Sequence, residues 1–511
     1  MNLMRLKSGT DVRGTAVGYD GSADFDLTDE AVKRITAAFV LFLSSKTGKD
    51  KDELVISVGH DSRVSANRIK KAVIDILLSM GVNVRDCSLC STPAMFMTTK
   101  LAGCDGAVQI TASHHPWDRN GLKFFTESGG LSGEELSKIL EVAEKYEAVA
   151  YDTSRDAQRI DFMSVYCEHL KDLIKKGVNS YINYDKPLDG LKIVVDAGNG
   201  VGGFFADKVL MPLGADITGS RFLEPDGMFP NHIPNPENKD AMKSICEATV
   251  ESGADLGVIF DTDVDRAACV SSDGKEINRN RLVALAAKIA LENNEGGTIV
   301  TDSVTSAGLT EFINETLGGV HRRFKRGYKN VIDESIRLCN EGINSPLAIE
   351  TSGHAAFREN YFLDDGAYLI TKIIIKLAEL RAEGKSLDDV IKDLKEPAEQ
   401  AEIRFNISEE NFKEYGERVI RHLESVARLK PDWELATDSC EGIKVSFNAP
   451  DKNGFFILRL SVHDPVMPMN IESAVSGGVL KIAYEIFEEL KIFAGLDMNA
   501  FSQLKENVII Y

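Results

Sequence analysis

No stretch of the 511-residue chain is apolar for long enough to cross a bilayer, and the first residues, MNLMRLKSGTD, contain no apolar core of the secretory type. Positive charge is also in deficit, since 59 Lys and Arg residues face 79 Asp and Glu residues and the net charge is −20. This balance argues against nucleic acid or an anionic membrane as the main partner. We therefore expect a cytoplasmic protein.

Cysteine is sparse, with eight residues scattered along the chain, so we expect reduced and mostly buried thiols. Cys87 and Cys90 form a lone CxxC pair, and because no second CxxC or His pair stands at metal spacing, a zinc site is not predicted. The chain is 43% hydrophobic and 27% charged, as in ordinary globular proteins, and its length suits roughly three or four domains.

One pattern occurs three times. Apolar, strand-like segments at residues 54–58, 191–195 and 298–300 each lead to an acidic residue, a helical pattern, a glycine and another strand-like segment. This predicts three related α/β domains in tandem. The tail from about residue 395 has strands and helices in a different order and predicts a C-terminal α+β domain. We place the four domains at residues 1–158, 159–278, 279–394 and 395–511.

The segment TASHHP, residues 111–116, directly follows the apolar residues 106–110 and precedes Asn120 and Lys123. It places the hydroxyl of Ser113 at the mouth of a strand, beside two histidines and near a lysine. Such a hydroxyl can be made reactive or can carry a phosphoryl group stabilised by positive charge. Taken alone, the segment suits equally well a turn in which Ser113 caps a following helix.

Three carboxylates follow the apolar residues 256–260 at alternate positions, Asp261, Asp263 and Asp265. They can converge on one hard cation, Mg²⁺ or Ca²⁺. An EF-hand loop is excluded, because Arg266 stands where that loop needs glycine and Ser272 where it needs glutamate. Three charges this close repel each other and the strand that leads in is apolar, so a metal site is favoured over a solvated acidic turn.

The segment GNGVGG, residues 198–203, matches the GxGxxG pattern of dinucleotide-binding proteins, and Asp216 follows it. A dehydrogenase is thus an alternative. The repeat gives the glycines a simpler role, as the strand-to-helix turn of the second domain.

Other polar loops follow strand-like segments. Glu350, Ser352 and His354 stand at alternate positions, can point one way from an extended loop and suit the vicinal hydroxyls of a sugar. Residues 325–329 form a basic loop that can contact an anion, although a surface turn is nearly as well supported. The strand-end segment RLSVHDP offers Arg459, Ser461 and His463 as phosphate ligands, or is an ordinary polar strand end.

Together, these motifs resemble those of the α-D-phosphohexomutase family over essentially the whole chain, in order and spacing. They read GTDVRG, VGHDSR, TASHHPWDRNGLK, VVDAGNG, EPDGMFPNHIPNPE, DTDVDR, RGYK, ETSGH and RLSVHDP. The resemblance implies four domains around a central active-site cleft. Each domain contributes one loop, which carries in turn the phosphoserine, the metal, the sugar and the phosphate.

The resemblance also implies roles for individual residues. Ser113 is phosphorylated in the resting enzyme, and it holds one Mg²⁺ together with Asp261, Asp263 and Asp265. Substrate-binding residues are the following: Glu350, Ser352 and His354 for sugar hydroxyls, Gly327 and Lys329 in the basic loop, and Arg459, Ser461 and His463 for the non-reacting phosphate. Candidates for the general acid and base are Lys123, Arg13, His114 and His354. Arg266, Arg63 and Asn120 are expected to neighbour the phosphoserine.

The implied activity is the interconversion of hexose 1-phosphate and hexose 6-phosphate, with glucose or mannose phosphates as substrates and a hexose 1,6-bisphosphate as activator and intermediate. The expected form is a monomer or homodimer. A phosphoglucosamine mutase and a non-catalytic sugar-bisphosphate sensor are the alternatives. The sensor is favoured only by two departures from the family pattern, His115 in place of asparagine and the altered phosphate loop around His463.

Overall fold

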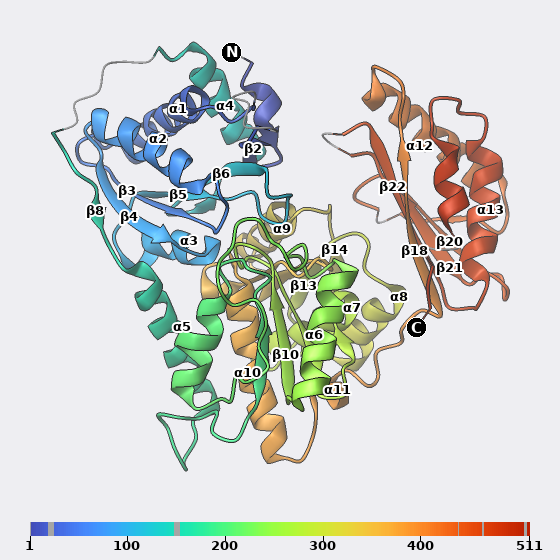
Figure 1. Ribbon diagram of the computed structural model, residues 1–511. Coiled ribbons are helices and arrows are strands. Elements are labelled where there is room, and N and C mark those ends of the chain that lie inside the picture. The colour runs from blue at the N-terminus through green and yellow to red at the C-terminus, as the bar shows by residue number, and fades with distance from the viewer. Residues whose placement is uncertain are drawn as a thin grey trace. The chain divides into compact units, whose positions relative to one another are not determined.

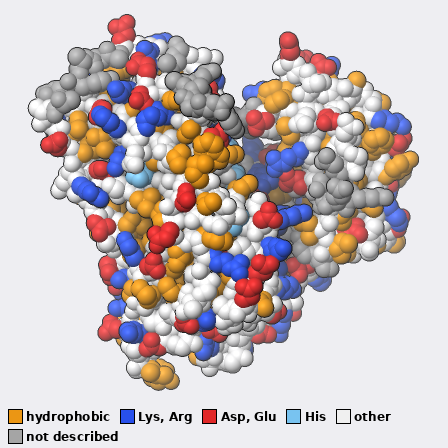
Figure 2. Space-filling model, viewed as in Figure 1, with side chains coloured by type: hydrophobic (Ala, Val, Ile, Leu, Met, Phe, Trp, Pro, Cys, Tyr) orange, Lys and Arg blue, Asp and Glu red, His pale blue; other side chains and the backbone are white. Residues whose placement is uncertain are grey.

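The computed structural model describes residues 2–18, 25–147, 154–437, 439–461, 464–504 and 508–510. It divides into two compact units, of which the first joins Met1–Asn293 to Pro346–Ile391 and the second joins Asn294–Ser345 to Lys392–Tyr511. No helix among the described residues is both long and apolar enough to span a membrane. On the face shown in Figure 2, acidic and basic side chains are interspersed, as on an ordinary solvated surface.

The N-terminal sheet of the first unit has the strand order β1-β2-β6-β5-β3-β4-β8, with β7 beside β6. The strands are β1 (Lys7–Ser8), β2 (Asp11–Thr15), β3 (Val55–His60), β4 (Asn83–Leu89), β5 (Gly106–Ile110), β6 (Arg119–Thr126), β7 (Gly129–Gly130) and β8 (Gln158–Arg159). Strands β3, β4 and β5 run parallel, whereas β6 is antiparallel to β5. Every residue of β5 is buried, as its apolar sequence predicted.

Helices cover both faces of this sheet (Figure 1). The apolar sides of α1 (Asp29–Thr47), α2 (Ala66–Ser79) and α4 (Gly133–Lys145) meet one face, where Phe39, Val73 and Leu140 belong to one buried cluster. Helix α3 (Thr92–Leu101) lies against the other face. Capping fixes the helix ends: the Thr28 side chain accepts the N–H of Ala31 at the start of α1, and Gly48 ends that helix with a φ of 72°.

The second sheet has the order β12-β11-β10-β9 and is covered by α6 (Lys239–Ser252). Its strands are β9 (Ile193–Asp196), β10 (Leu256–Phe260), β11 (Ala267–Ser271) and β12 (Glu276–Ile277). The first unit also contains α5 (Phe162–Val178), α7 (Arg279–Leu291), α10 (Gly366–Ala382), α11 (Leu387–Val390), β15 (Leu347–Ile349), β16 (Ala355–Phe357), β17 (Leu363–Asp364) and the single turns η1 (Met4–Leu6) and η6 (Arg358–Asn360).

The three predicted catalytic loops occupy equivalent places in the chain. Each joins a buried strand to its antiparallel neighbour: residues 111–118 join β5 to β6, residues 261–266 join β10 to β11, and residues 350–354 join β15 to β16. The repeat therefore places the serine, the carboxylates and the sugar-loop residues each at the end of a strand, where ligands bind in α/β folds.

The second copy of the repeat departs from the prediction. Its expected helix is a π-helical turn, η3 (Phe205–Leu210), followed by a 3₁₀ turn, η4 (Met211–Leu213). Pro212 cannot donate a backbone hydrogen bond and Gly214 has a φ of 97°, so a regular α-helix is interrupted here. The strand-like segment expected after Gly214 forms only isolated bridges, Lys192 to Asp216 and Asp196 to Arg221. In the third copy, α8 (Ala307–Glu311) likewise continues as a π-helical turn, η5 (Phe312–Thr316).

The second unit contains a six-stranded sheet of order β19-β20-β21-β22-β18-β23. Its elements are β18 (Glu399–Asn406), α12 (Phe412–Leu429), β19 (Glu434–Leu435), β20 (Ile443–Phe447), β21 (Gly454–Leu458), β22 (Val466–Ser473), α13 (Gly478–Leu490), η7 (Met498–Gln503) and β23 (Ile509–Ile510). Alternate residues of β18, such as Ile403 and Phe405, face the core formed with α12 and α13. The unit also holds β13 (Thr298–Thr301), parallel to β14 (Val320–Arg323), and α9 (Tyr328–Asn340). The fold is thus three tandem α/β domains and a C-terminal sheet domain, as predicted.

The glycine-rich turn at residues 198–203 has a packing role. Four successive backbone N–H groups, of residues 198–201, already donate to protein oxygens. A Cβ atom on Gly203 would lie 2.1 Å from the carbonyl oxygen of Leu223, and one on Gly200 would lie 2.6 Å from that of Thr262. These glycines allow neighbouring backbones to approach closely, which supports the turn interpretation over the dinucleotide site.

Candidate functional site

Ser113 is buried near the start of the loop after β5, with a left-handed φ of 50° that is uncommon for a residue other than glycine. Its backbone N–H donates to Thr111 Oγ1 at 2.9 Å, and its own Oγ donates to Asp261 Oδ2 at 3.0 Å. His114 Nδ1 lies 3.4 Å from the same Oγ. Since the loop leads into strand β6 and not into a helix, the helix-cap interpretation of Ser113 is wrong.

Arg63 holds the backbone of this loop. Its fully buried guanidinium donates to four carbonyl oxygens, those of Ser113 at 2.5 Å, His115 at 2.6 Å, Pro116 at 2.5 Å and Arg119 at 3.0 Å. Asp61 Oδ2 accepts from Arg63 Nε at 3.1 Å, which neutralises the buried charge. The loop conformation, and hence the direction of the Ser113 hydroxyl, depends on this ion pair.

We expect Arg63→Lys to destabilise the protein by about 2–4 kcal/mol, because an ammonium group cannot serve four carbonyls in the plane of a guanidinium and leaves buried acceptors unsatisfied. Thermal denaturation measures the change. Arg5→Lys is the matched control, since the Arg5 side chain is 58% exposed and pairs with Asp26 at 3.0 Å. Equal effects of the two substitutions would show that Arg63 does not organise the loop.

The three aspartates of the second loop converge as the sequence predicted. Ligand atoms of Asp261, Asp263 and Asp265 all lie within 4.8 Å of one another, and all three residues are buried. Lys123 Nζ donates to Asp263 Oδ2 at 3.0 Å and also to Asp265 Oδ2. Within the described part of the chain, Asp263 Oδ1 and Asp265 Oδ1 are buried without a hydrogen-bond partner. Unsatisfied carboxylate oxygens of this kind fit a hard cation such as Mg²⁺.

The backbone of the metal loop is strained. Val264, a β-branched residue, has a left-handed φ of 69°. Its carbonyl accepts the N–H of Gly366 at 3.1 Å, at the start of α10. A Cβ atom on Gly366 would lie 2.8 Å from the Arg266 carbonyl carbon, so glycine is needed where the helix start meets the loop. Through these contacts, the start of α10 supports the loop that carries the three carboxylates.

Burial and neighbouring charges shift the pKa values of the titratable groups of the site in different directions. Burial, with repulsion from Asp265 and Asp263, raises the pKa of Asp261 well above its ordinary value. Burial also acts to raise the pKa of Asp265, but Lys123, His354 and Arg266 together outweigh it and the pKa falls below the ordinary value. Burial, with repulsion from Arg266, keeps the pKa of His114 far below its ordinary value, so this imidazole is neutral at neutral pH. Burial and Arg13 lower the pKa of His115 to about 3.

The sugar-loop residues lie beside the metal loop. Arg266 Nε donates to His354 Nε2 at 2.7 Å, and His354 Nδ1 lies 2.5 Å from Asp364 Oδ2. Because Nε2 accepts, the ring proton of neutral His354 is on Nδ1, the ring nitrogen beside Asp364. Burial and Arg266 lower the pKa of His354 to about 4. Ser352 Oγ donates to Glu350 Oε2 at 3.5 Å, and both residues are buried.

The other two candidates near Ser113 differ in their surroundings. Arg13 Nη2 pairs with Asp11 at 2.8 Å, while its Nη1 is buried without a hydrogen-bond partner among the described residues. That nitrogen can donate to an anion. Asn120 uses its amide locally, since Nδ2 donates to Ser65 Oγ at 2.9 Å and Oδ1 accepts the N–H of Gly121. Its contacts are those of a residue that supports β6.

Family models decide the kinship of the chain. Models described as phosphoglucomutase/phosphomannomutase alpha/beta/alpha domains I, II and III match residues 10–150, 164–274 and 278–397. The chain belongs to the phosphoglucomutase/phosphomannomutase family, a branch of the α-D-phosphohexomutases. The serine loop and the carboxylate loop lie within the ranges matched by the first and second models.

Individual relatives agree. A phosphoglucomutase of Neisseria gonorrhoeae is 28% identical over 458 residues, 89% of this chain and 92% of the relative. A phosphomannomutase/phosphoglucomutase of Pseudomonas aeruginosa is 26% identical over 472 residues, 91% of this chain and 94% of the relative. A crystal structure of a phosphoglucomutase/phosphomannomutase family protein from Burkholderia thailandensis has a TM-score of 0.78 and 25% identity and covers 96% of this chain and 98% of its own.

The remaining predicted phosphohexomutase residues lie in the second unit. Gly327, with a φ of 116°, precedes α9, and Lys329 Nζ pairs with Asp333 one helical turn later. Arg459 directly follows β21, and its Nη2 donates to Asn470 Oδ1 at 3.1 Å. The Ser461 hydroxyl accepts the N–H of Asp464 at 3.2 Å. His463 lies outside the described residues.

Two residues that hold the site were not predicted. Thr92, at the start of α3, donates its hydroxyl to Asp263 Oδ2 and its backbone N–H to the Asp263 carbonyl at 2.9 Å. Nothing local in the sequence pairs it with an aspartate 171 positions away. Asp364 ends the short strand β17 in the sequence FLDDG, and two adjacent carboxylates after an apolar residue were a usable signal.

Proposed function

We propose that this protein moves a phosphoryl group between C1 and C6 of glucose or mannose monophosphates, and that Ser113 carries the group between the two positions. The observation that supports this proposal most strongly is the hydrogen bond from Ser113 Oγ to Asp261 Oδ2 at 3.0 Å, inside a buried cluster of three carboxylates and one lysine. A nucleophilic oxygen, a cation site and a buried positive charge together suit phosphoryl transfer.

The donor set supports a magnesium site beside Ser113. Asp261, Asp263 and Asp265 would hold the ion, which supplies positive charge to the phosphoryl oxygens during transfer. Lys123 and the unpartnered Nη1 of Arg13 add fixed positive charge from the protein itself. The overall charge of the chain is −20, so these local cations are needed to receive an anionic substrate.

In the first transfer, the bond between phosphorus and Ser113 Oγ breaks and a bond forms from phosphorus to the free hydroxyl oxygen of the hexose monophosphate. The sugar hydroxyl loses its proton and Oγ gains one. In the return transfer Oγ attacks phosphorus and loses its proton, and the neutral His114, whose Nδ1 lies 3.4 Å from Oγ, is placed to accept it. Lys123 has a pKa raised well above its ordinary value, since Asp263 and Asp265 outweigh burial, and it therefore stays protonated as a cation and hydrogen-bond donor.

The bisphosphate product then turns over within the site and returns its other phosphoryl group to Ser113, so that the net change is a move between C1 and C6. Glu350 and Ser352 are the proposed ligands of the sugar hydroxyls. Arg459 and Ser461 are the proposed ligands of the phosphate that does not react in each step, since a guanidinium binds phosphate in two places. His354, fixed between Arg266 and Asp364, orients the Arg266 guanidinium.

One assay tests the function. Glucose 1-phosphate, mannose 1-phosphate and glucosamine 1-phosphate are each supplied with Mg²⁺ and a trace of the matching bisphosphate, and the 6-phosphate is measured. We expect turnover of the glucose and mannose compounds. Preference for the amino sugar would make the protein a phosphoglucosamine mutase, and failure to turn over any of the three would favour a non-catalytic sugar-bisphosphate sensor.

A further inference from the structure

One carboxylate oxygen of Glu441, in the second unit, lies close to polar groups of three separate segments. Its Oε1 accepts from Ser303 Oγ and, at 3.0 Å, from the backbone N–H of Arg326, and it lies 3.9 Å from Arg459 Nη1. Ser303 follows β13, and Arg326 belongs to the predicted substrate loop at residues 325–329. A carboxylate thus lies against the arginine expected to bind a phosphate.

The backbone holds Glu441 in this place. Gly442 has a left-handed φ of 55°, and a Cβ atom on it would lie 2.1 Å from the Leu458 carbonyl oxygen and 3.0 Å from Arg459 Cα. The turn before β20 therefore packs directly on the end of β21, and only glycine allows the approach. As a result, the hairpin of β20 and β21 places the Glu441 carboxylate next to the Arg459 guanidinium.

The Arg459 guanidinium is only partly satisfied. Its side chain is 9% exposed, Nη2 donates to Asn470, and Nε is buried without a hydrogen-bond partner among the described residues. Burial, with repulsion from Arg326, lowers the pKa of Arg459 below its ordinary value. At 3.9 Å the Glu441 carboxylate compensates the charge but makes no hydrogen bond to it, whereas a phosphate has enough acceptor oxygens to do both.

We propose that Glu441 is a built-in competitor of the substrate's non-reacting phosphate: it occupies the anion site at Arg459 when phosphate is absent, and phosphate binding displaces it and releases residues 439–441 from Ser303 and Arg326. The inference rests on the proposed function in taking Arg459 as a phosphate ligand. It adds a residue that sets the affinity of the site for phosphate and couples binding to a movement of this loop.

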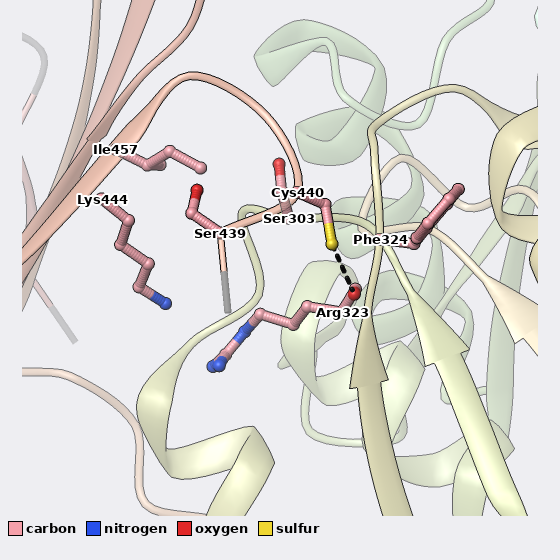
Figure 3. Close-up of a pocket in the computed structure, with 7 residues that line it drawn as sticks. All are labelled: Ser303, Arg323, Phe324, Ser439, Cys440, Lys444 and Ile457. Carbon is pink, nitrogen blue, oxygen red and sulfur yellow. Dashed lines mark hydrogen bonds between the residues drawn. The ribbon is translucent and has the colours of Figure 1, made fainter. Parts of the chain in front are cut away.

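Cys440, next to Glu441, reports on the release. Its Sγ lies 3.6 Å from the Arg323 carbonyl oxygen (Figure 3). The two residues line one small pocket with Ser303, Phe324, Ser439, Lys444 and Ile457. Arg323 is anchored separately, because its guanidinium donates to the carbonyl oxygens of Thr305 and Ser306. Cys440 is half-buried here, and when residues 439–441 leave, its thiol becomes more exposed while Arg323 stays in place.

The first test uses the unaltered protein. Iodoacetamide labelling of Cys440 is followed by peptide mass spectrometry with and without inorganic phosphate. We expect phosphate to accelerate labelling of Cys440 several-fold and to leave the buried Cys87 and Cys90 unlabelled. An unchanged or slower rate at Cys440 would overturn the proposal.

The second test uses Glu441→Gln, which keeps an acceptor for Ser303 and Arg326 but removes the charge. We expect its Kd for inorganic phosphate, measured by calorimetry, to fall about five- to tenfold, because residue 441 no longer carries a negative charge that competes with phosphate for Arg459. Glu434→Gln is the matched control, since Glu434 carries the same charge in the same domain and accepts a neutral amide hydrogen bond from Asn448 at 2.8 Å. An unchanged or weaker affinity in Glu441→Gln would contradict the competition.

These readouts separate the inference from the proposed function, because neither needs turnover. If phosphate speeds the labelling of Cys440 and Glu441→Gln binds phosphate more tightly, but no hexose phosphate is turned over, only the mutase proposal is contradicted. If turnover is normal, but Cys440 labelling does not respond to phosphate and Glu441→Gln gains no phosphate affinity, only the inference about Glu441 is contradicted.

Discussion

We expect Ser113→Ala to lower kcat for hexose-phosphate interconversion by at least about 10⁴-fold, because it removes the oxygen that we propose carries the phosphoryl group. The alanine side chain fits the buried position and the loop is still held by Arg63 through backbone carbonyls, so the protein remains folded. The measurement is the rate of glucose 6-phosphate formation from glucose 1-phosphate with Mg²⁺ and glucose 1,6-bisphosphate.

Ser62→Ala is the matched control for that variant. Ser62 also lies in a loop that follows a strand of the first sheet, but its buried hydroxyl has no hydrogen-bond partner within the described residues. Its replacement is expected to leave turnover near the wild-type rate. Substantial turnover by Ser113→Ala would show that phosphoryl transfer does not pass through this serine.

Asp261→Asn moves activity and stability in opposite directions. We expect activity to fall about 10³-fold or more, because the proposed magnesium site loses the ligand that also receives the Ser113 hydroxyl. Stability in EDTA rises by roughly 1–3 kcal/mol, the free energy carried by a perturbed carboxylate. The amide oxygen still accepts the Arg266 N–H, the amide NH2 that replaces the other oxygen can donate to the Ser113 hydroxyl oxygen, and repulsion from the other two aspartates is gone.

The sign follows from the pKa of Asp261. Burial and the neighbouring carboxylates raise it above the ordinary value of 3.8, so the folded protein favours the neutral acid. Above both pKa values the ionised group costs stability, and asparagine removes that cost. Thermal denaturation in EDTA and then in excess Mg²⁺ measures both effects. Asp207→Asn, at an exposed position, is the control, and a lower melting temperature for Asp261→Asn in EDTA would contradict the charge-repulsion account.

Much of the fold follows from local patterns. The apolar residues 106–110 and 256–260 coincide with β5 and β10, since a buried strand needs a continuous apolar run. The irregular turns at residues 205–213 could not be predicted, because Pro212 and the packing around Gly203 decide the local conformation against helical periodicity. Strand order depends on contacts between distant segments, which no local pattern encodes.

The candidate site divides in the same way. Ser113 and the three aspartates could be found because each motif is short and lies directly after a strand. The role of Arg63 could not, since its four acceptors are backbone carbonyls more than 45 residues away, and carbonyls leave no trace in a sequence. The position of Glu441 beside Arg459 required the register of β20 and β21, in which Ile443 pairs with Leu458.

The central claim is that Ser113 carries the phosphoryl group. Its most direct test is the intact mass of the phosphatase-treated protein, measured before and after incubation with glucose 1,6-bisphosphate and Mg²⁺. The account predicts a gain of one phosphoryl group, mapped to Ser113 and absent from Ser113→Ala. No gain by the wild-type protein during active turnover, or an equal gain by Ser113→Ala, would contradict it.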